Sequence, residues 1–140
     1  MSQNGNAGHT QIRPPAPGGD PAFTQAVSLL TGRARTIHIR AQGAVDATGK
    51  IVGAKDIAAQ TIQILRNLEA RLEAAGASPE HLMGCSLNIK AGADLQAAFA
   101  AGRQWWGPRP NPPINSIMFV PKLLRPEFLI TIEGVAIVPR

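Results

Sequence analysis

Few residues in this sequence are of a type and at a spacing that would suit catalysis or metal binding. Cys85 is the single cysteine among 140 residues, so no disulfide can form within the chain. It lies in a run of alternating apolar residues, which favours a core position over a nucleophile. No spacing of His, Cys and Asp suggests a metal site, and His9, in a segment rich in Gly and Pro, is expected to be solvated. We therefore expect neither a metal nor a cofactor.

The cations of the sequence do not indicate a nucleic-acid partner. The formal charge is +5, but Lys and Arg are scattered, and Arg33, Arg35 and Arg40 are the closest approach to a cluster. Aromatic residues for stacking on bases are few, with two Trp, four Phe and no Tyr. No His pair and no set of Lys, His and Glu for RNA cleavage can be assembled. Nucleic-acid binding is not favoured.

Length and composition indicate one globular domain. Apolar residues make up 44% and charged residues 16% of the sequence. No stretch is long and apolar enough to cross a membrane, and the first residues lack the features of a signal peptide. With its one cysteine, the chain is expected to be cytoplasmic. Residues 1–21, rich in Gly, Pro, Asn and Gln, predict a flexible or extended arm, and residues 22–140 a single domain.

The segment from Asp56 to Ser78 has the start, the periodicity and the end of an amphipathic helix. Asp56 can accept hydrogen bonds from the first free N–H groups, and Gly76 can adopt the left-handed conformation that ends a helix. The apolar stripe consists of Ile57, Ile64, Leu65, Leu68 and Leu72.

The other segments predict five strands, a second helix and a single helical turn. Alternating or continuous apolar patterns indicate the strands, and a capping Asp and a Ser-Pro pair mark the helix and the turn. The strands are predicted at Phe23–Leu30, Thr36–Ala41, Leu82–Lys90, Ile114–Val120 and Leu129–Val138, the helix at Asp94–Trp106, and the turn at Ser78–Glu80.

This order of elements predicts an α+β fold with one mixed sheet and two helices on one face. The last strand is apolar on both faces and should be central. The other face of the sheet would then carry apolar side chains that no helix covers. Burial between subunits is the expected solution.

These segments together resemble the RidA/YjgF family of reactive-intermediate deaminases, also called endoribonuclease L-PSP, from about Pro21 to Pro139. The resemblance rests on several motifs in their order along the chain, and no single motif carries it. They are Gly49-Lys-Ile-Val-Gly, Asp56-Ile-Ala-Ala-Gln-Thr, Asn67-Leu-Glu-Ala, Ala74-Ala-Gly-Ala-Ser78, Trp105-Trp106-Gly107 and Ile132-Glu133-Gly-Val-Ala136.

The resemblance implies a chorismate-mutase-like fold and a homotrimer whose sheets form an inner β-barrel. It also implies a pocket at each subunit interface, which hydrolyses an imine or enamine to a ketone and ammonia. Such a site needs a cation for the substrate carboxylate and a carboxylate that orients water. By this resemblance Glu133 orients the water.

The chain departs from the family at the carboxylate-binding position. The family's Pro-Ala-Arg-Ser/Thr motif is Pro113-Ile-Asn-Ser here, so Asn115 replaces the arginine and supplies no charge. The family's Ser-Gly-Gln motif reads Arg40-Ala41-Gln42. One hypothesis is that Arg40 takes over anion binding while Asn115 hydrogen-bonds the substrate. The alternative is that Arg40 is solvated or structural and the pocket is inactive.

Three further positions match the family's pocket. Phe23 stands where an aromatic Tyr is frequent, Ala41 follows Arg40, and Ile117 replaces a cysteine found in some members. The expected ligand is a small carboxylate-type molecule. A trimer that binds a metabolite without turnover is the alternative function, and endoribonuclease activity ranks third.

Overall fold

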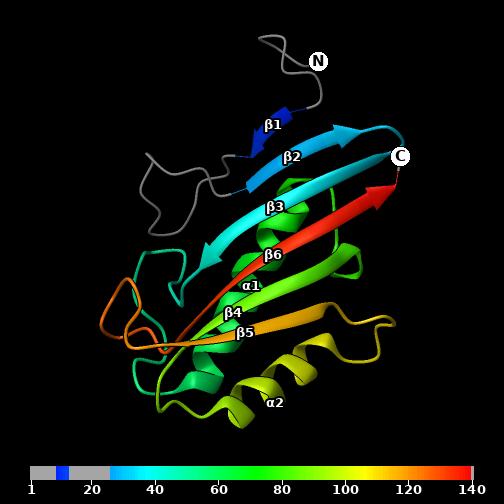
Figure 1. The fold of residues 1–140 in the computed structure, drawn as a ribbon. Helices are drawn as coiled ribbons and strands as arrows, with labels where there is room; N and C mark the ends of the chain where they lie inside the picture. Colours follow the sequence, from blue (N-terminus) through cyan, green and yellow to red (C-terminus); the bar gives the residue numbers. More distant parts are fainter. Residues whose placement is uncertain (1–8, 13–25, 140) are drawn as a thin grey trace.

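A computed structural model describes residues 9–12 and 26–139 and shows one sheet with two long helices (Figure 1). The elements follow one another as β1 (His9–Ile12), β2 (Ala26–Thr31), β3 (Ala34–Gln42), α1 (Ile57–Ala74), the 3-10 turn η1 (Pro79–His81), β4 (Leu82–Lys90), α2 (Leu95–Trp106), β5 (Ile114–Val120) and β6 (Ile130–Pro139).

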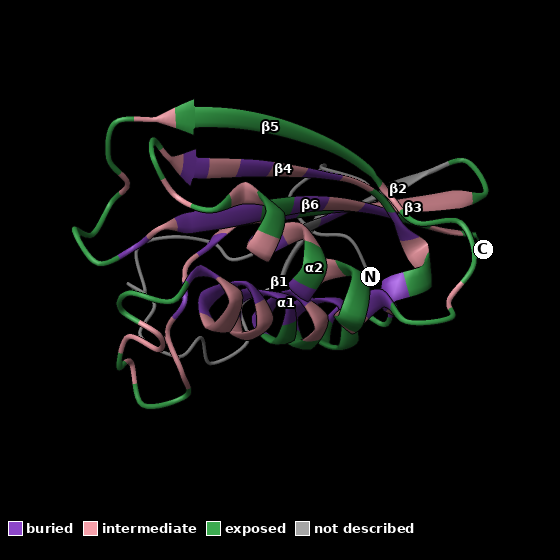
Figure 2. Ribbon diagram, turned by 90° about the horizontal axis from the view of Figure 1, so that it is seen from below, coloured by how far each residue is buried: buried purple, intermediate pink, exposed green. Residues whose placement is uncertain are grey.

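The six strands form a mixed sheet in the order β1-β2-β3-β6-β4-β5. β4 and β5 are parallel, and all other neighbours are antiparallel. The last strand, β6, lies between β3 and β4, as its two apolar faces predicted. Both helices lie on one side of the sheet (Figure 2). The predicted α+β fold is confirmed.

Helix α1 begins and ends where its sequence signals predicted. The Asp56 carboxylate accepts from the Ala59 N–H at 3.1 Å. At the other end, Gly76 has φ +76°, and the Ala77 N–H donates to the Leu72 carbonyl at 2.8 Å, which closes a Schellman motif. The five apolar residues of the predicted stripe are all buried against the sheet.

Helix α2 covers the part of the sheet beside β4 and β5. The Asp94 carboxylate caps it by accepting from the Ala97 N–H at 3.1 Å, and Gly107, at φ +63°, ends it. Ala98 and Trp106 are buried, and Phe99 packs against the core. A helix therefore covers this half of the sheet, and the sequence had predicted that helix at nearly the same residues.

The N-terminal half of the sheet differs in detail from the expectation. His9–Ile12, within the predicted arm, forms β1 and pairs with β2. β3 extends to Gln42 and contains an irregularity between Ile39 and Gln42, where two residues oppose one residue of β6. Phe23 lies outside the described residues.

Among the described residues β5 forms an edge of the sheet, and all its residues except the half-buried Val120 are exposed (Figure 2). Isolated subunits seldom leave such an edge uncovered. No helix among the described residues has the length and apolar character needed to cross a membrane. The large exposed apolar side chains of β5 are Ile114, Ile117, Met118 and Phe119.

Candidate active site

The irregularity in β3 places Arg40 and Ala41 opposite Glu133. Ile39 pairs with Gly134 and Gln42 with Ile132, so both intervening residues of β3 face the single residue Glu133 of β6. Bulges of this kind redirect side chains and are frequent beside active sites. Here the bulge brings Arg40 opposite Glu133, the carboxylate that is expected, from the family resemblance, to orient a water molecule.

Arg40 and Glu133 line one hollow, of about 660 Å³, on the sheet face without helices. We call it the sheet-face hollow. Glu133 is exposed, and its partner on β4 is Ser86, whose partner on β5 is Ser116. The polar lining residues are His38, Arg40, Ser86, Ser116 and Glu133. The hollow thus combines a cation, a carboxylate and two hydroxyls, the groups needed to hold an anion and to position water.

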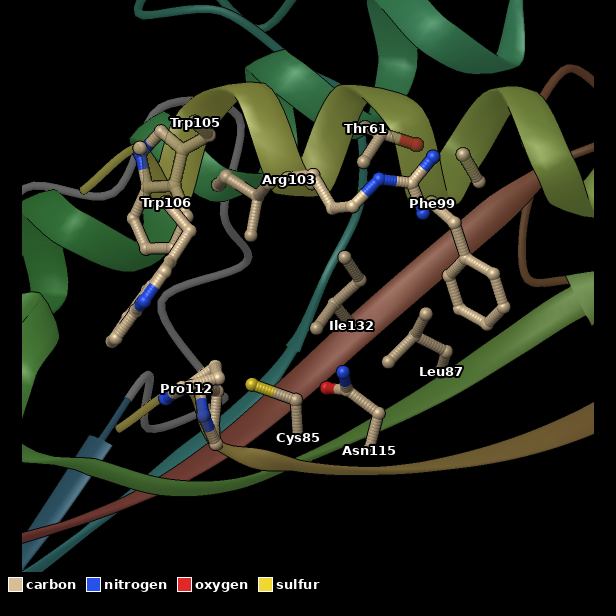
Figure 3. A pocket seen from close by; sticks show the side chains of 15 residues that line it. Thr61, Cys85, Leu87, Phe99, Arg103, Trp105, Trp106, Pro112, Asn115 and Ile132 are labelled. Carbon is tan, nitrogen blue, oxygen red and sulfur yellow. The ribbon is translucent and has the colours of Figure 1, made fainter. Parts of the chain in front are cut away.

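A second cavity, of about 520 Å³, lies between α2 and the other face of the sheet (Figure 3). We call it the α2 cavity. Asn115 of β5 and Cys85 of β4 are paired in register and both point into it. The other labelled lining residues are Thr61, Leu87, Phe99, Arg103, Trp105, Trp106, Pro112 and Ile132.

Cys85 occupies the core position that its alternating pattern predicted. Its side chain is buried, and burial raises the pKa of the thiol to about 11. At neutral pH the sulfur therefore stays protonated and is a poor nucleophile. The α2 cavity has a neutral floor, made of a thiol and an amide.

Asn115 and Glu133 therefore lie on opposite faces of the sheet within one chain. Asn115 pairs with Cys85, which faces α2, whereas Glu133 pairs with the next residue, Ser86, which faces the open side. Ile117 is on the same face as Asn115 and is 38% exposed. Ala41 is half-buried beside Arg40 in the bulge. The structure unites Arg40 with Glu133 but separates both from Asn115.

The Trp pair at the end of α2 is held rigidly by hydrogen bonds. Trp105 Nε1 donates to Glu69 Oε1 at 3.1 Å, and Trp106 Nε1 donates to the Arg109 carbonyl at 2.6 Å. The Arg109 guanidinium lies over both rings and donates from Nη1 to the carbonyls of Trp105 and Trp106. Trp106 is buried, Trp105 packs against the core, and both line the α2 cavity.

Arg109 and Arg71 are two residues whose importance the sequence reasoning missed. Arg109 also forms an ion pair with Glu80, at 3.1 Å from Nε to Oε1. Arg71 lies on the buried face of α1, is 4% exposed, and its Nε finds no hydrogen-bond partner among the described residues. A signal for Arg71 was present, because it follows Ile64 by seven residues and so falls on the apolar stripe.

The described residues offer no group of three or more His, Cys, Asp or Glu side chains that could hold a metal ion. Each cavity offers the chemistry of its own side chains. In the sheet-face hollow this is anion binding and proton transfer, and in the α2 cavity it is apolar contact with a few neutral hydrogen-bonding groups.

A family profile described as Endoribonuclease L-PSP matches residues 15–138. The chain belongs to this family. Its members include proteins called YjgF and Rid, so the resemblance read from the sequence is confirmed at the level of the family. No curated protein shows significant similarity to the chain.

Solved structures of Rid-family proteins superpose on nearly the whole chain. The Rid protein YyfB of unknown function from Yersinia pestis is 34% identical, with 94% of this chain and 99% of that chain covered and a TM-score of 0.66. The E. coli YjgF gene product is 25% identical, with 91% and 97% covered and a TM-score of 0.77. E. coli TdcF with bound serine shares the fold at 22% identity, with 92% and 98% covered and a TM-score of 0.78.

Proposed function

We propose that this Rid-family protein hydrolyses an imine or enamine of a small carboxylate-bearing metabolite to a ketone and ammonia. One observation carries the proposal: Arg40 and Glu133 line the same hollow, opposite one another across the β3 bulge. A guanidinium binds a carboxylate through parallel N–H donors, which restores the charge that Asn115 lacks. The site then has a replacement for the missing arginine.

In this mechanism Arg40 holds the substrate carboxylate and Glu133 acts on the water. Water adds to the carbon of the C=N bond, Glu133 accepts a proton from it, and the same proton is returned to the nitrogen. The carbinolamine then loses ammonia and leaves the ketone. The hydroxyls of Ser86 and Ser116, which line the same hollow, are placed to hydrogen-bond the water.

Asn115 joins this site from a neighbouring subunit. Within one chain its side chain is on the face opposite Glu133, but β5 is a free edge with exposed apolar side chains. Docking of this edge against the open sheet face of a second copy would cover those side chains and bring Asn115 to the hollow. Members of the family are typically homotrimers, and we propose the same assembly here, with an inner β-barrel and a pocket at each interface.

The test is ammonia release from imines generated in situ from amino acids by an amino-acid oxidase. The wild-type protein should accelerate ammonia release, and Glu133→Gln and Arg40→Ala should each lower kcat/KM at least about 100-fold. Glu73→Gln and Arg33→Ala change exposed residues outside both cavities and serve as matched controls with unchanged rates. Equal rates for Glu133→Gln and wild type would refute the proposal.

A second candidate function is binding without turnover in the α2 cavity. The observation that favours it is the lining of this cavity, which includes no acidic residue and no histidine among the described residues. Such a site can hold a ligand but has no group for general acid–base catalysis. Saturable binding of a ligand, with no ammonia released from any imine tested, would favour this candidate over the first.

A further inference from the structure

We propose that the α2 cavity receives an aromatic side chain of the substrate, so that the preferred substrates are imines of aromatic amino acids. This inference rests on the proposed function, in which Asn115, and with it the α2 cavity, reaches the sheet-face hollow of a neighbouring subunit.

The size and wall of the cavity suit a ring rather than a small polar group. Its volume of about 520 Å³ falls within the range of about 300–1,000 Å³ typical of ligand pockets. Apolar side chains from four elements form most of the wall, so a methyl-sized substituent would leave most of the space unfilled. They are Leu65 of α1, Leu87 of β4, Phe99 and Trp106 of α2, and Ile132 of β6.

The polar groups inside the cavity are neutral and few. Thr61 Oγ1 donates to the Ile57 carbonyl at 2.7 Å, so its O–H is already engaged. The thiol of Cys85 is buried and protonated. Asn115 supplies the remaining polar group, an amide that points into the cavity (Figure 3). The free-energy cost of burying a charged group would not be compensated by these neutral groups. A ring with at most one hydrogen-bonding substituent carries no such cost, because Asn115 can pair with the substituent.

One charged residue stands among the described residues that line the cavity. Arg103 is exposed, and it is the charged residue among those that line the cavity. An anionic group of the ligand can contact the Arg103 guanidinium only if that group remains at the solvent-exposed side of the cavity. The orientation that fits is therefore ring inward and carboxylate outward.

The aromatic wall is preorganised. The indole N–H groups of Trp105 and Trp106 are both engaged by the protein, and the two rings are tilted at 53° with centroids 6.0 Å apart. The Arg109 guanidinium already lies over both rings, and rings held in this way lose little entropy when a ligand contacts the part that lines the cavity. A tilted pair also presents the edge-to-face geometry that a third ring prefers.

The test measures binding of 3-phenylpropanoate and propanoate through tryptophan fluorescence. The chain has two Trp residues, and both line the cavity. The variant Gly102→Leu fills the cavity from α2, where a Cβ at position 102 would meet nothing within 4 Å. Leu also favours the helix more than Gly, so this variant should fold. The matched control is Ala100→Leu on the exposed face of the same helix.

We expect 3-phenylpropanoate to shift the fluorescence with an affinity at least 10-fold higher than that of propanoate. Gly102→Leu should lower this affinity at least 10-fold, and Ala100→Leu should not change it. Equal affinity for the two probes, or binding unaffected by Gly102→Leu in a folded protein, would overturn the inference.

Ammonia release separates a failure of this inference from a failure of the proposed function. If small and aromatic imines are hydrolysed equally well by wild type and Gly102→Leu, the deaminase stands and the aromatic pocket is refuted. If 3-phenylpropanoate binds as expected and no imine is hydrolysed, the pocket stands and the deaminase is refuted.

Discussion

Asn115 and Cys85 lie side by side in register across β5 and β4, and both side chains enter the cavity beneath α2. Because successive residues of a strand point to opposite faces, this pairing fixes the faces of their neighbours. Ser86 and Glu133 are directed to the open face as a consequence. The pairing of β4 with β5 and β6 thus explains why the two candidate cavities lie on opposite faces of the sheet.

Replacing the buried Arg71 should stabilise the protein. Its Nε is buried without a partner in the part of the chain that the structure describes, burial lowers the pKa of its guanidinium, and the positive charge of Arg40 lowers this pKa further. An arginine stays charged nevertheless, so the cost of burial is not relieved. Arg71→Met should raise the free energy of unfolding by about 1 kcal/mol or more.

Thermal or urea unfolding of Arg71→Met beside Arg66→Met checks this prediction. Arg66 is an exposed residue of the same helix, and its replacement should change stability by less than about 0.5 kcal/mol. A loss of stability in Arg71→Met would contradict the prediction.

Gly43, just after the bulged strand, should tolerate no side chain. A Cβ at this position would fall against the ring of Phe128, which is buried. Gly43→Ala should therefore destabilise the fold by about 1–3 kcal/mol through overpacking. Gly84→Ala is the matched control, since its Cβ would find its nearest neighbour, the Ile114 carbonyl oxygen, at 3.5 Å. Similar urea midpoints for the two variants would contradict the tight packing of this loop.

Cys85 should react slowly with alkylating reagents in the native protein. Burial raises its pKa to about 11, so at pH 8 only about one thiol in a thousand is ionised. Because the thiolate is the reactive form, labelling by iodoacetamide should accelerate about tenfold per pH unit between pH 7 and 10. Mass spectrometry follows the rate, and the urea-unfolded chain gives the reference for an accessible cysteine. Native labelling at pH 7 as fast as that reference would contradict a buried thiol.

Local signals in the sequence were sufficient for the helices. Asp56 and Asp94 are both N-caps, and the five apolar residues of α1 are buried as their spacing predicted. The central position of β6 in the sheet also followed from its apolar composition. These features depend on residues close together in the chain.

The candidate site could be predicted only in part, because it depends on contacts between distant segments. The motifs identify Arg40, Asn115 and Glu133 but not the faces to which they point. The face of Asn115 depends on its parallel pairing with Cys85, and the approach of Arg40 to Glu133 depends on a bulge between β3 and β6. Neither a register nor a bulge leaves a signature in one strand alone.

The central claim is that each active site takes Glu133 from one subunit and Asn115 from its neighbour. Mixed oligomers test it most directly. Glu133→Gln and Asn115→Leu, each of low activity alone, are unfolded together, refolded and assayed for ammonia release. In random mixed oligomers about a quarter of the interfaces combine an intact Glu133 with an intact Asn115, so about a quarter of the wild-type activity should return. A mixture no more active than its two parents, beside active refolded wild type, would contradict a site shared between subunits.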